Sequence, residues 1–297
     1  MLVTMKEIVD RAAKENYGVA APNVSSEFDA RACIEIAEDL KSPLILDVFY
    51  RATTDAQFLG RILRELANQS SVPVCINLDH GKKKNEIIGA LQAGFTSVMI
   101  DKSDCDYETN VREVKEIVAI AHSVGVTVEA ELGHVGQAAN AEIDTRSALT
   151  VPAEAKRFVD ETGVDCLAVA IGTAHGAYPR GFVPHLDFER LAAIKQAVGA
   201  DYPLVLHGSS GMDNASLEKA CHMGINKVNI ATELSQAAAE CSLEFAQGKS
   251  AGRFWKLLKQ AMQLKLAEKI KVYGSDGRAW DVKKTGLPHK PVTMEEK

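Results

Sequence analysis

Eight short apolar runs recur along the chain, and stretches with the apolar spacing of amphipathic helices separate them. Each run is rich in Val, Ile or Leu with little polar alternation, which is typical of parallel strands buried on both faces. The runs lie at residues 17–23, 43–48, 73–80, 97–101, 126–133, 166–172, 203–207 and 227–232. Eight strands alternating with helices predict an α/β fold, a (β/α)8 TIM barrel.

A doubly wound sheet is the main alternative, but it predicts fewer strands and usually a Gly-rich turn after the first. Here the first run ends in APNVSS, without a GxGxxG motif. No linker, repeat or low-complexity segment divides the 297 residues, so we expect a single barrel domain over 1–297. A helical extension is expected at about 233–275, followed by a polar, mobile tail. Its lysine-rich stretch 251–272 is either a solvated face or an arm that packs on a neighbouring subunit.

The charge balance argues against some classes of partner. With 34 Lys and Arg against 40 Asp and Glu, the net charge is −6, which disfavours an extended nucleic-acid surface or a polybasic membrane patch. A local pocket for a phosphorylated metabolite is compatible with it. The first 16 residues resemble an amphipathic helix rather than a signal peptide, and no apolar stretch approaches the roughly 18 residues that span a bilayer. Six scattered cysteines complete the expectation of a cytoplasmic protein with reduced thiols and neither nucleic-acid nor membrane partners.

Three histidines stand at the carboxyl ends of predicted strands. His80, His175 and His207 each follow an apolar run, and each precedes a glycine. The carboxyl ends of barrel strands form the active-site face, and three imidazoles with an open fourth position are typical of a catalytic zinc. Any one of them alone is better explained as a structural histidine, and it is the shared position of all three that favours a metal site. The other five are expected to be structural or at the surface, with His134 the least certain.

Carboxylates occupy the same predicted rim. Asp79 directly precedes His80, Asp101 ends the fourth run, and Glu131 ends the fifth. Such groups serve as general acids and bases, as partners that orient metal-binding imidazoles, or as helix N-caps. For Asp101 the cap and the functional interpretation remain equally open.

The segments HGSSG (207–211) and NIAT (229–232) follow the seventh and eighth strands. Barrels often bind phosphate there, through backbone N–H groups and a helix N-terminus. Gly-Ser-Ser-Gly by itself also fits an ordinary turn.

Six motifs resemble the class II, zinc-dependent ketose-bisphosphate aldolases. They are LDHG, SVMIDKS, VEAELGHVG, TGVDCLAVAIGTAHGAY, PLVLHGSSG and GINKVNIATEL, and the match runs in order from about residue 5 to 275. The resemblance implies a lyase that cleaves a ketose phosphate reversibly to dihydroxyacetone phosphate and an aldehyde, through a zinc-stabilised enediolate. Members are dimers or tetramers, so a homodimer or homotetramer is implied.

The resemblance also implies roles for residues at matching positions. His80, His175 and His207 would bind Zn²⁺, and Asp79 would donate and accept the proton at the C4 hydroxyl. Asp101 and Glu131 match positions that bind a second or displaced metal in some members. A monovalent cation, Na⁺ or K⁺, is expected near the phosphate. Dihydroxyacetone phosphate would be held by Gly176, Gly208, Ser209, Ser210, Asn229, Ile230, Ala231 and Thr232.

The sequence departs from the family pattern at the aldehyde end of the substrate. Phe49 stands where fructose-bisphosphate members usually carry a Ser, Pro179 replaces the usual Lys after HGxY with Arg180 beside it, and Lys102 replaces a Gly. With Asn23, these are the candidate specificity residues. We therefore predict that the substrate is not fructose 1,6-bisphosphate but a ketose 1-phosphate or a sugar-acid 1-phosphate. The alternatives are a plain fructose- or tagatose-bisphosphate aldolase, a zinc hydrolase and a non-catalytic scaffold.

Overall fold

The computed structural model describes residues 1–50, 55–136, 138, 149–176, 178, 182, 184–248 and 251–281. Eight parallel strands form one sheet in the order β1-β8-β7-β6-β5-β4-β3-β2. They are β1 (Val19–Pro22), β2 (Leu44–Phe49), β3 (Val74–Gly81), β4 (Ser97–Ile100), β5 (Thr127–Leu132), β6 (Cys166–Val169), β7 (Leu204–Leu206) and β8 (Ile225–Ile230). The sheet curls into a barrel in which β1 and β2, the two ends of this order, lie side by side. Just after β1, Val24 N donates to Asp47 O of β2 at 2.8 Å. The predicted barrel is confirmed.

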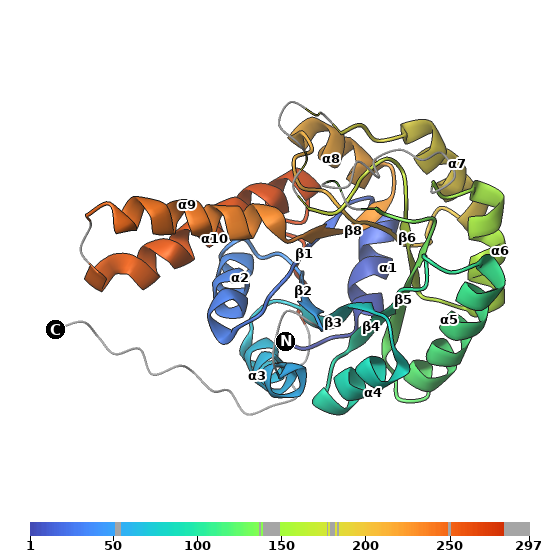
Figure 1. Cartoon of the computed structure of the whole chain (residues 1–297), viewed down its shortest axis with the longest axis horizontal. Coiled ribbons are helices and arrows are strands. Elements are labelled where there is room, and N and C mark those ends of the chain that lie inside the picture. The colour runs from blue at the N-terminus through green and yellow to red at the C-terminus, as the bar shows by residue number, and fades with distance from the viewer. Residues whose placement is uncertain are drawn as a thin grey trace.

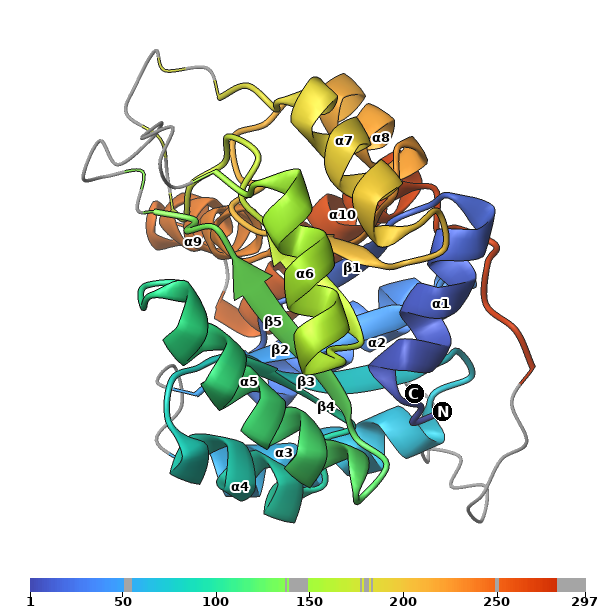
Figure 2. The same cartoon turned by 90° about the vertical axis from the view of Figure 1, so that its right-hand side faces the viewer.

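Helices cover the outside of the barrel and alternate with its strands (Figures 1 and 2). They are α2 (Glu27–Asp39), α3 (Ala56–Gln69), α4 (Lys84–Ala93), α5 (Tyr107–His122), α6 (Pro152–Thr162), α7 (Phe188–Val198) and α8 (Asn214–His222). The main core lies between their apolar faces and the outward side chains of the strands. Asp106 is the N-cap of α5, accepting from Thr109 N, so the cap interpretation of Asp101 is wrong.

The first helix closes one end of the barrel. Helix α1 (Met5–Glu15) starts with a capping box between Thr4 and Glu7 and lies inside the ring of strands when the barrel is viewed end-on (Figure 1). Its side chains Met5 and Ile8 share a second apolar cluster with inward residues of the strands such as Val205. With this end filled, the opposite end, where the strands terminate, is left for the site.

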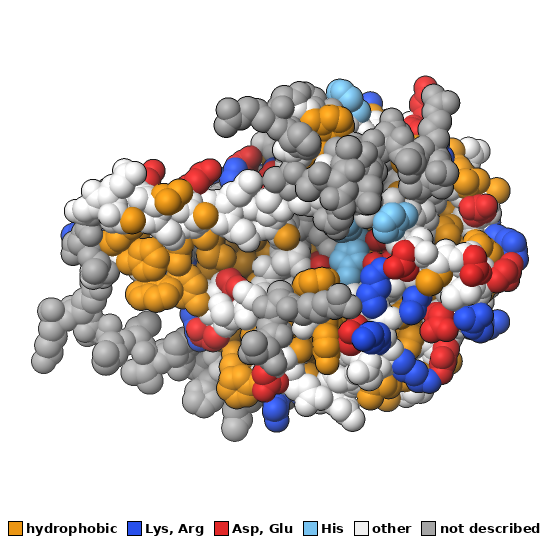
Figure 3. All heavy atoms as spheres, in the orientation of Figure 1, with side chains coloured by type: hydrophobic (Ala, Val, Ile, Leu, Met, Phe, Trp, Pro, Cys, Tyr) orange, Lys and Arg blue, Asp and Glu red, His pale blue; other side chains and the backbone are white. Residues whose placement is uncertain are grey.

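A helical hairpin projects beyond the barrel (Figure 1). It consists of α9 (Thr232–Ala246), the 3₁₀ turn η2 (Ala251–Arg253) and α10 (Phe254–Tyr273), within the stretch expected to form the extension. The end of α10 is anchored because Leu266, Ile270 and Tyr273 are buried against the main core. The outer part carries apolar side chains at the surface (Figure 3), among them Leu243 and Trp255, which are 66% and 64% exposed.

Helices within the described ranges lack the combination of length and apolar character that crossing a bilayer requires. The tail beyond residue 281 lies outside the described residues. All six cysteines are free, and four of them are buried, as expected for scattered thiols.

Candidate active site

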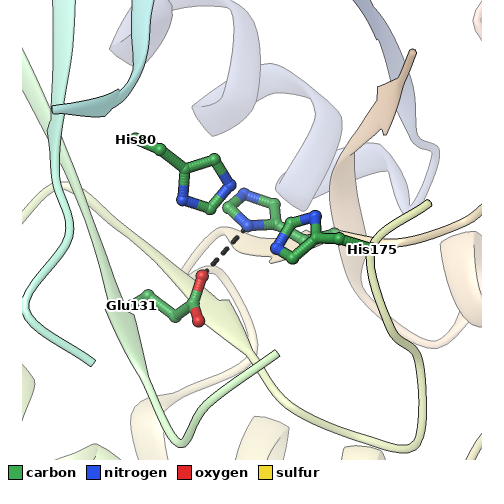
Figure 4. A group of neighbouring side chains, drawn as sticks. His80, Glu131 and His175 are labelled. Carbon is green, nitrogen blue, oxygen red and sulfur yellow. Dashed lines mark hydrogen bonds and ion pairs between the residues drawn. The ribbon is translucent and has the colours of Figure 1, made fainter. Parts of the chain in front are cut away.

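The three predicted histidines meet at the carboxyl ends of β3, β6 and β7. The ring of His80 is 4.8 Å from that of His175 and 4.7 Å from that of His207, between centroids. The three histidines and Glu131, at the end of β5, each offer one ligand atom, and these four atoms all lie within 4.8 Å of one another. Figure 4 shows His80, Glu131 and His175 converging, with a dashed line from Glu131 to the third imidazole.

This donor set fits a zinc ion. Imidazole nitrogen and carboxylate oxygen are ligands that zinc prefers, and two imidazoles are oriented from behind by carboxylates. His80 Nδ1 lies 2.8 Å from Asp101 Oδ2, and His207 Nε2 lies 3.0 Å from Glu129 Oε1. These contacts leave His80 Nε2 and His207 Nδ1 as the nitrogens that could bind a metal, and a carboxylate behind the imidazole is the usual support of a metal-binding histidine.

The protonation of the cluster follows from its surroundings. Burial, together with the neighbouring charges of His80 and His207, lowers the pKa of His175 to about 4, so this imidazole is neutral and available as a ligand. Burial also opposes protonation of His207, but its hydrogen bonds with Glu129 and Glu131 outweigh burial and raise its pKa to about 10. In the absence of a metal His207 is therefore protonated and donates one N–H to each carboxylate, and a cation bound at Nδ1 would displace the proton there.

Asp79 lies beside the cluster with both carboxylate oxygens bonded to amides. Asn23 Nδ2 donates to Oδ2 at 2.8 Å, and Asn229 Nδ2 donates to Oδ1 at 3.1 Å. Burial opposes ionisation, but the charges of His80 and Lys227 outweigh burial and lower the pKa of Asp79 to about 2. The carboxylate is thus ionised at neutral pH and in the state that accepts a proton.

A cavity of about 510 Å³ opens above these groups, and histidines are visible at its mouth (Figure 3). Besides His80, Glu131, His175 and Asp79, it is lined by the predicted phosphate-loop residues Gly176, Gly208, Ser209, Ser210, Asn229, Ala231 and Thr232. His207 is fully buried and does not line it. Ile230 is buried in β8 and does not line it. Helix α9 begins at Thr232 without a side-chain cap, so its first backbone N–H groups are free to bind an anion at the cavity.

The two phosphate-type loops are held close together. Ser209 Oγ donates to Asn229 O at 2.7 Å, which ties the loop after β7 to the end of β8. Gly208 has a φ of +67°, and a Cβ there would stand 2.4 Å from Ala174 O. Only glycine tolerates this approach. The passage of the loop beside Ala174 brings His207 and His175 together, with ring centroids 5.7 Å apart.

The specificity candidates divide into three groups. Phe49 and Asn23 line the cavity, and Phe49 is the register partner of Asp79. Lys102 is partly buried and does not line it. Lys82, which no sequence pattern singled out, lines it instead, and its Nζ lies 2.9 Å from Asp101 Oδ2. Pro179 and Arg180 lie outside the described residues.

Sequence reasoning also missed a layer of polar residues beneath the cavity. Asp47, Asn77, Glu129 and Lys227 are fully buried inside the barrel. Each of them precedes a site residue or specificity candidate by two positions, as Asn77 precedes Asp79, and side chains two apart on a strand share a face. That spacing, applied to charges within apolar runs, is the signal that could have found them.

Comparisons with known proteins agree with this geometry. A family model described as "Fructose-bisphosphate aldolase class-II" matches residues 3–278. A fructose-bisphosphate aldolase of Thermus caldophilus is 41% identical, covering 94% of this chain and 100% of the relative. The uncharacterized protein YdjI of Escherichia coli K12 is 37% identical with the same coverage. The crystal structure of the YdjI aldolase matches with a TM-score of 0.84 and 36% identity, over 94% of this chain and 100% of that one. The similarity therefore extends over nearly the whole chain.

Proposed function

This chain belongs to the class II fructose-bisphosphate aldolase family and is a metal-dependent aldolase, and we propose that it cleaves a ketose 1-phosphate or a sugar-acid 1-phosphate to dihydroxyacetone phosphate and an aldehyde. The observation that carries this choice of substrate is the place of Phe49. Its ring lines the cavity on the strand next to that of Asp79.

Asp79 transfers the proton at the C4 hydroxyl in this proposal. Its carboxylate is ionised, held by two amides, and exposed to the cavity within reach of a bound substrate. C4 belongs to the half of the ketose that leaves as the aldehyde. Groups that flank Asp79, namely Phe49 and Asn23, therefore surround that half and select it.

The phosphate at carbon 1 is assigned to the opposite side of the cavity. The backbone of Gly208 and Ser209 and the N-terminus of α9 supply N–H donors and a favourable helix dipole there. We propose the monovalent cation, Na⁺ or K⁺, for the same side, close to the phosphate.

His80, His175 and His207 would hold Zn²⁺, with Glu131 as an additional or alternative ligand. A bound zinc would supply Lewis acidity at the ketose carbonyl and the adjacent hydroxyl. The contact of Asp101 with His80 favours an orienting role for this carboxylate over direct metal binding.

A second phosphate finds little support at the aldehyde end. Phe49 offers no hydrogen-bond donor, and Lys82, the one Lys or Arg among the cavity-lining residues of the described ranges, is paired with Asp101 and Asp104. A plain fructose- or tagatose-bisphosphate aldolase, the main alternative, would need a cation free for that phosphate. The hydrolase and scaffold alternatives are disfavoured by membership of an aldolase family.

Two wider features of the proposal rest on separate observations. A cytoplasmic location suits six free cysteines, because a reducing compartment keeps thiols free. The exposed apolar residues of the hairpin, Leu243, Trp255 and Leu264, favour contact of the stretch 251–272 and its neighbour α9 with another subunit of a homodimer or homotetramer.

A substrate panel tests the proposal. The zinc-loaded enzyme is assayed with ketose 1-phosphates, sugar-acid 1-phosphates and the fructose and tagatose 1,6-bisphosphates, with coupled detection of dihydroxyacetone phosphate. We expect the highest kcat/KM for a substrate with one phosphate. Equal or faster cleavage of either bisphosphate would establish the plain bisphosphate aldolase instead.

A further inference from the structure

Lys227 is a fully buried cation inside the barrel, beneath the cavity. Its Nζ lies 2.9 Å from Glu129 Oε2, 3.1 Å from Asp47 Oδ2 and 2.8 Å from Asn229 Oδ1. An ammonium group is costly to bury, and these three acceptors replace the water that it loses. Two of the three also contact groups of the site: Glu129 contacts the buried His207, and Asn229 contacts the cavity-lining Asp79.

The first of these contacts leads to a metal-binding imidazole. Lys227 binds one oxygen of Glu129, and the other, Oε1, lies 3.0 Å from His207 Nε2. The carboxylate is therefore held at both ends. Its fixed position keeps a proton on His207 Nε2 and leaves His207 Nδ1 facing the cluster.

The second contact leads to Asp79. An ammonium group only donates hydrogen bonds, so the atom of Asn229 that faces Lys227 must be its carbonyl oxygen. The amide nitrogen then points the other way and donates to Asp79 Oδ1 at 3.1 Å. If the cation were absent, Asn229 Oδ1 would lose its donor, and the amide would be free to move away from Asp79.

We propose that Lys227 is a positioning residue that aligns His207 through Glu129 and Asp79 through Asn229, and so couples the metal site to the proton-transfer group. The proposal rests on the functions proposed above for His207 and Asp79. The competing explanation is that Lys227 only neutralises Asp47 and Glu129 inside the barrel.

A charge-balanced variant separates the two explanations. Lys227→Met leaves two carboxylates unpaired and can prevent folding, whereas Lys227→Met combined with Asp47→Asn removes one charge of each sign and leaves Glu129 as the single charge of this group. If Lys227 positions the site, the double variant folds but binds Zn²⁺ at least about tenfold more weakly, measured by competition with a chromophoric chelator. Its kcat falls about a hundredfold or more while KM changes less than about threefold.

Two further readouts do not depend on turnover. Nitrogen NMR of ¹⁵N-histidine protein reports the tautomer of His207, which we expect to be Nε2–H in the zinc-loaded wild type and mixed in the double variant. A crystal structure of the double variant should show the amide of Asn229 displaced from its 3.1 Å contact with Asp79 Oδ1. Because neither readout needs a substrate, both test the role of Lys227 even if the wild type cleaves none of the substrates in the panel.

Lys195→Met is the matched control. Lys195 is a partly buried lysine on α7 that donates to the backbone oxygens of Tyr202 and Gly224, away from the cavity lining. We expect this variant to retain the zinc affinity, kcat and His207 tautomer of the wild type. A double variant with zinc affinity and kcat within threefold of the wild type would overturn the proposal and leave Lys227 a charge-balancing role.

Discussion

Phe49 and Asp79 are register partners on the neighbouring strands β2 and β3, so an apolar ring stands beside the proposed proton-transfer carboxylate at the rim of the barrel. The ring is 37% exposed, and it faces the cavity without a hydrogen-bond donor to offer. A substrate whose C4 hydroxyl reaches Asp79 must place the rest of its aldehyde half near this ring. In the proposed function, two adjacent strands therefore carry the specificity residue and the proton-transfer residue.

Phe49→Ser should shift specificity toward phosphorylated aldehydes. A hydroxyl at the rim supplies a hydrogen bond and opens space, and one such bond is worth about 1.5–3 kcal/mol when its partner is charged. We expect the ratio of kcat/KM for fructose 1,6-bisphosphate to that for the best ketose 1-phosphate to rise about tenfold. Phe49→Leu, which shortens the side chain without adding a donor, is the control. An unchanged ratio in Phe49→Ser would remove Phe49 from the specificity site.

Asp79→Ala should reduce cleavage severely while the zinc content stays near one ion per chain. Proton transfer by a positioned carboxylate contributes about 10²–10⁴ in rate, so kcat should fall by that factor. The four clustered donor residues do not include Asp79, which is why the metal should remain. Kinetics and metal analysis of the same sample check both expectations. Loss of zinc from Asp79→Ala would instead assign this carboxylate a structural role.

Removal of the metal should abolish aldol cleavage, and zinc or cobalt should restore it. The stripped protein should also unfold at a lower temperature, because a ligand at 1,000 times its Kd adds about 4 kcal/mol to the free energy of unfolding. Exchange of a C3 proton of dihydroxyacetone phosphate with solvent gives a second assay that needs no aldehyde. This exchange should stop when the metal is removed and return when zinc or cobalt is added, as cleavage does. Full activity of the stripped protein would exclude the metal mechanism.

The barrel and the three histidines could be predicted because both leave local patterns. Buried parallel strands read as apolar runs, and His80, His175 and His207 stand where such runs end. The supporting groups leave weaker patterns. Lys82 was missed because a lysine after HG resembles a solvated loop residue, and its contact with Asp101 depends on how two strand ends meet. The cap interpretation of Asp101 failed because Asp106, five residues later, is the aspartate that meets the helix.

Titration of Lys195 should make the free energy of unfolding rise with pH between about 8 and 10.5. Partial burial lowers the pKa of Lys195 from 10.5 to about 8 in the folded state. Between these two values the unfolded chain binds more protons than the folded one, so the free energy of unfolding rises with pH and falls again as pH drops through 8. Urea unfolding at pH 7.5 and pH 10 should show a larger difference in the wild type than in Lys195→Met. Equal differences would mean that Lys195 titrates alike in both states.

Asp101→Asn should weaken zinc binding without changing its stoichiometry. Burial opposes ionisation of Asp101, but its hydrogen bonds with His80 and Lys82 hold its pKa well below the usual range, so His80 Nδ1 faces a full negative charge at 2.8 Å. Loss of such support typically costs 10- to 100-fold in metal affinity. Competition titrations with a chelator would measure the affinity, and metal analysis at saturation the stoichiometry.

The matched control for this change is Asp104→Asn. Asp104 is an exposed partner of Lys82 that does not contact His80. The zinc affinity of the Asp104→Asn protein should therefore stay at the wild-type value. The stoichiometry at saturating metal distinguishes the two proposed roles of Asp101, since an orienting carboxylate changes the affinity of one ion, whereas a ligand of a second ion changes the number bound. If Asp101→Asn bound one ion fewer per chain than the wild type, Asp101 would be a metal ligand in its own right, as its position in the family pattern implies.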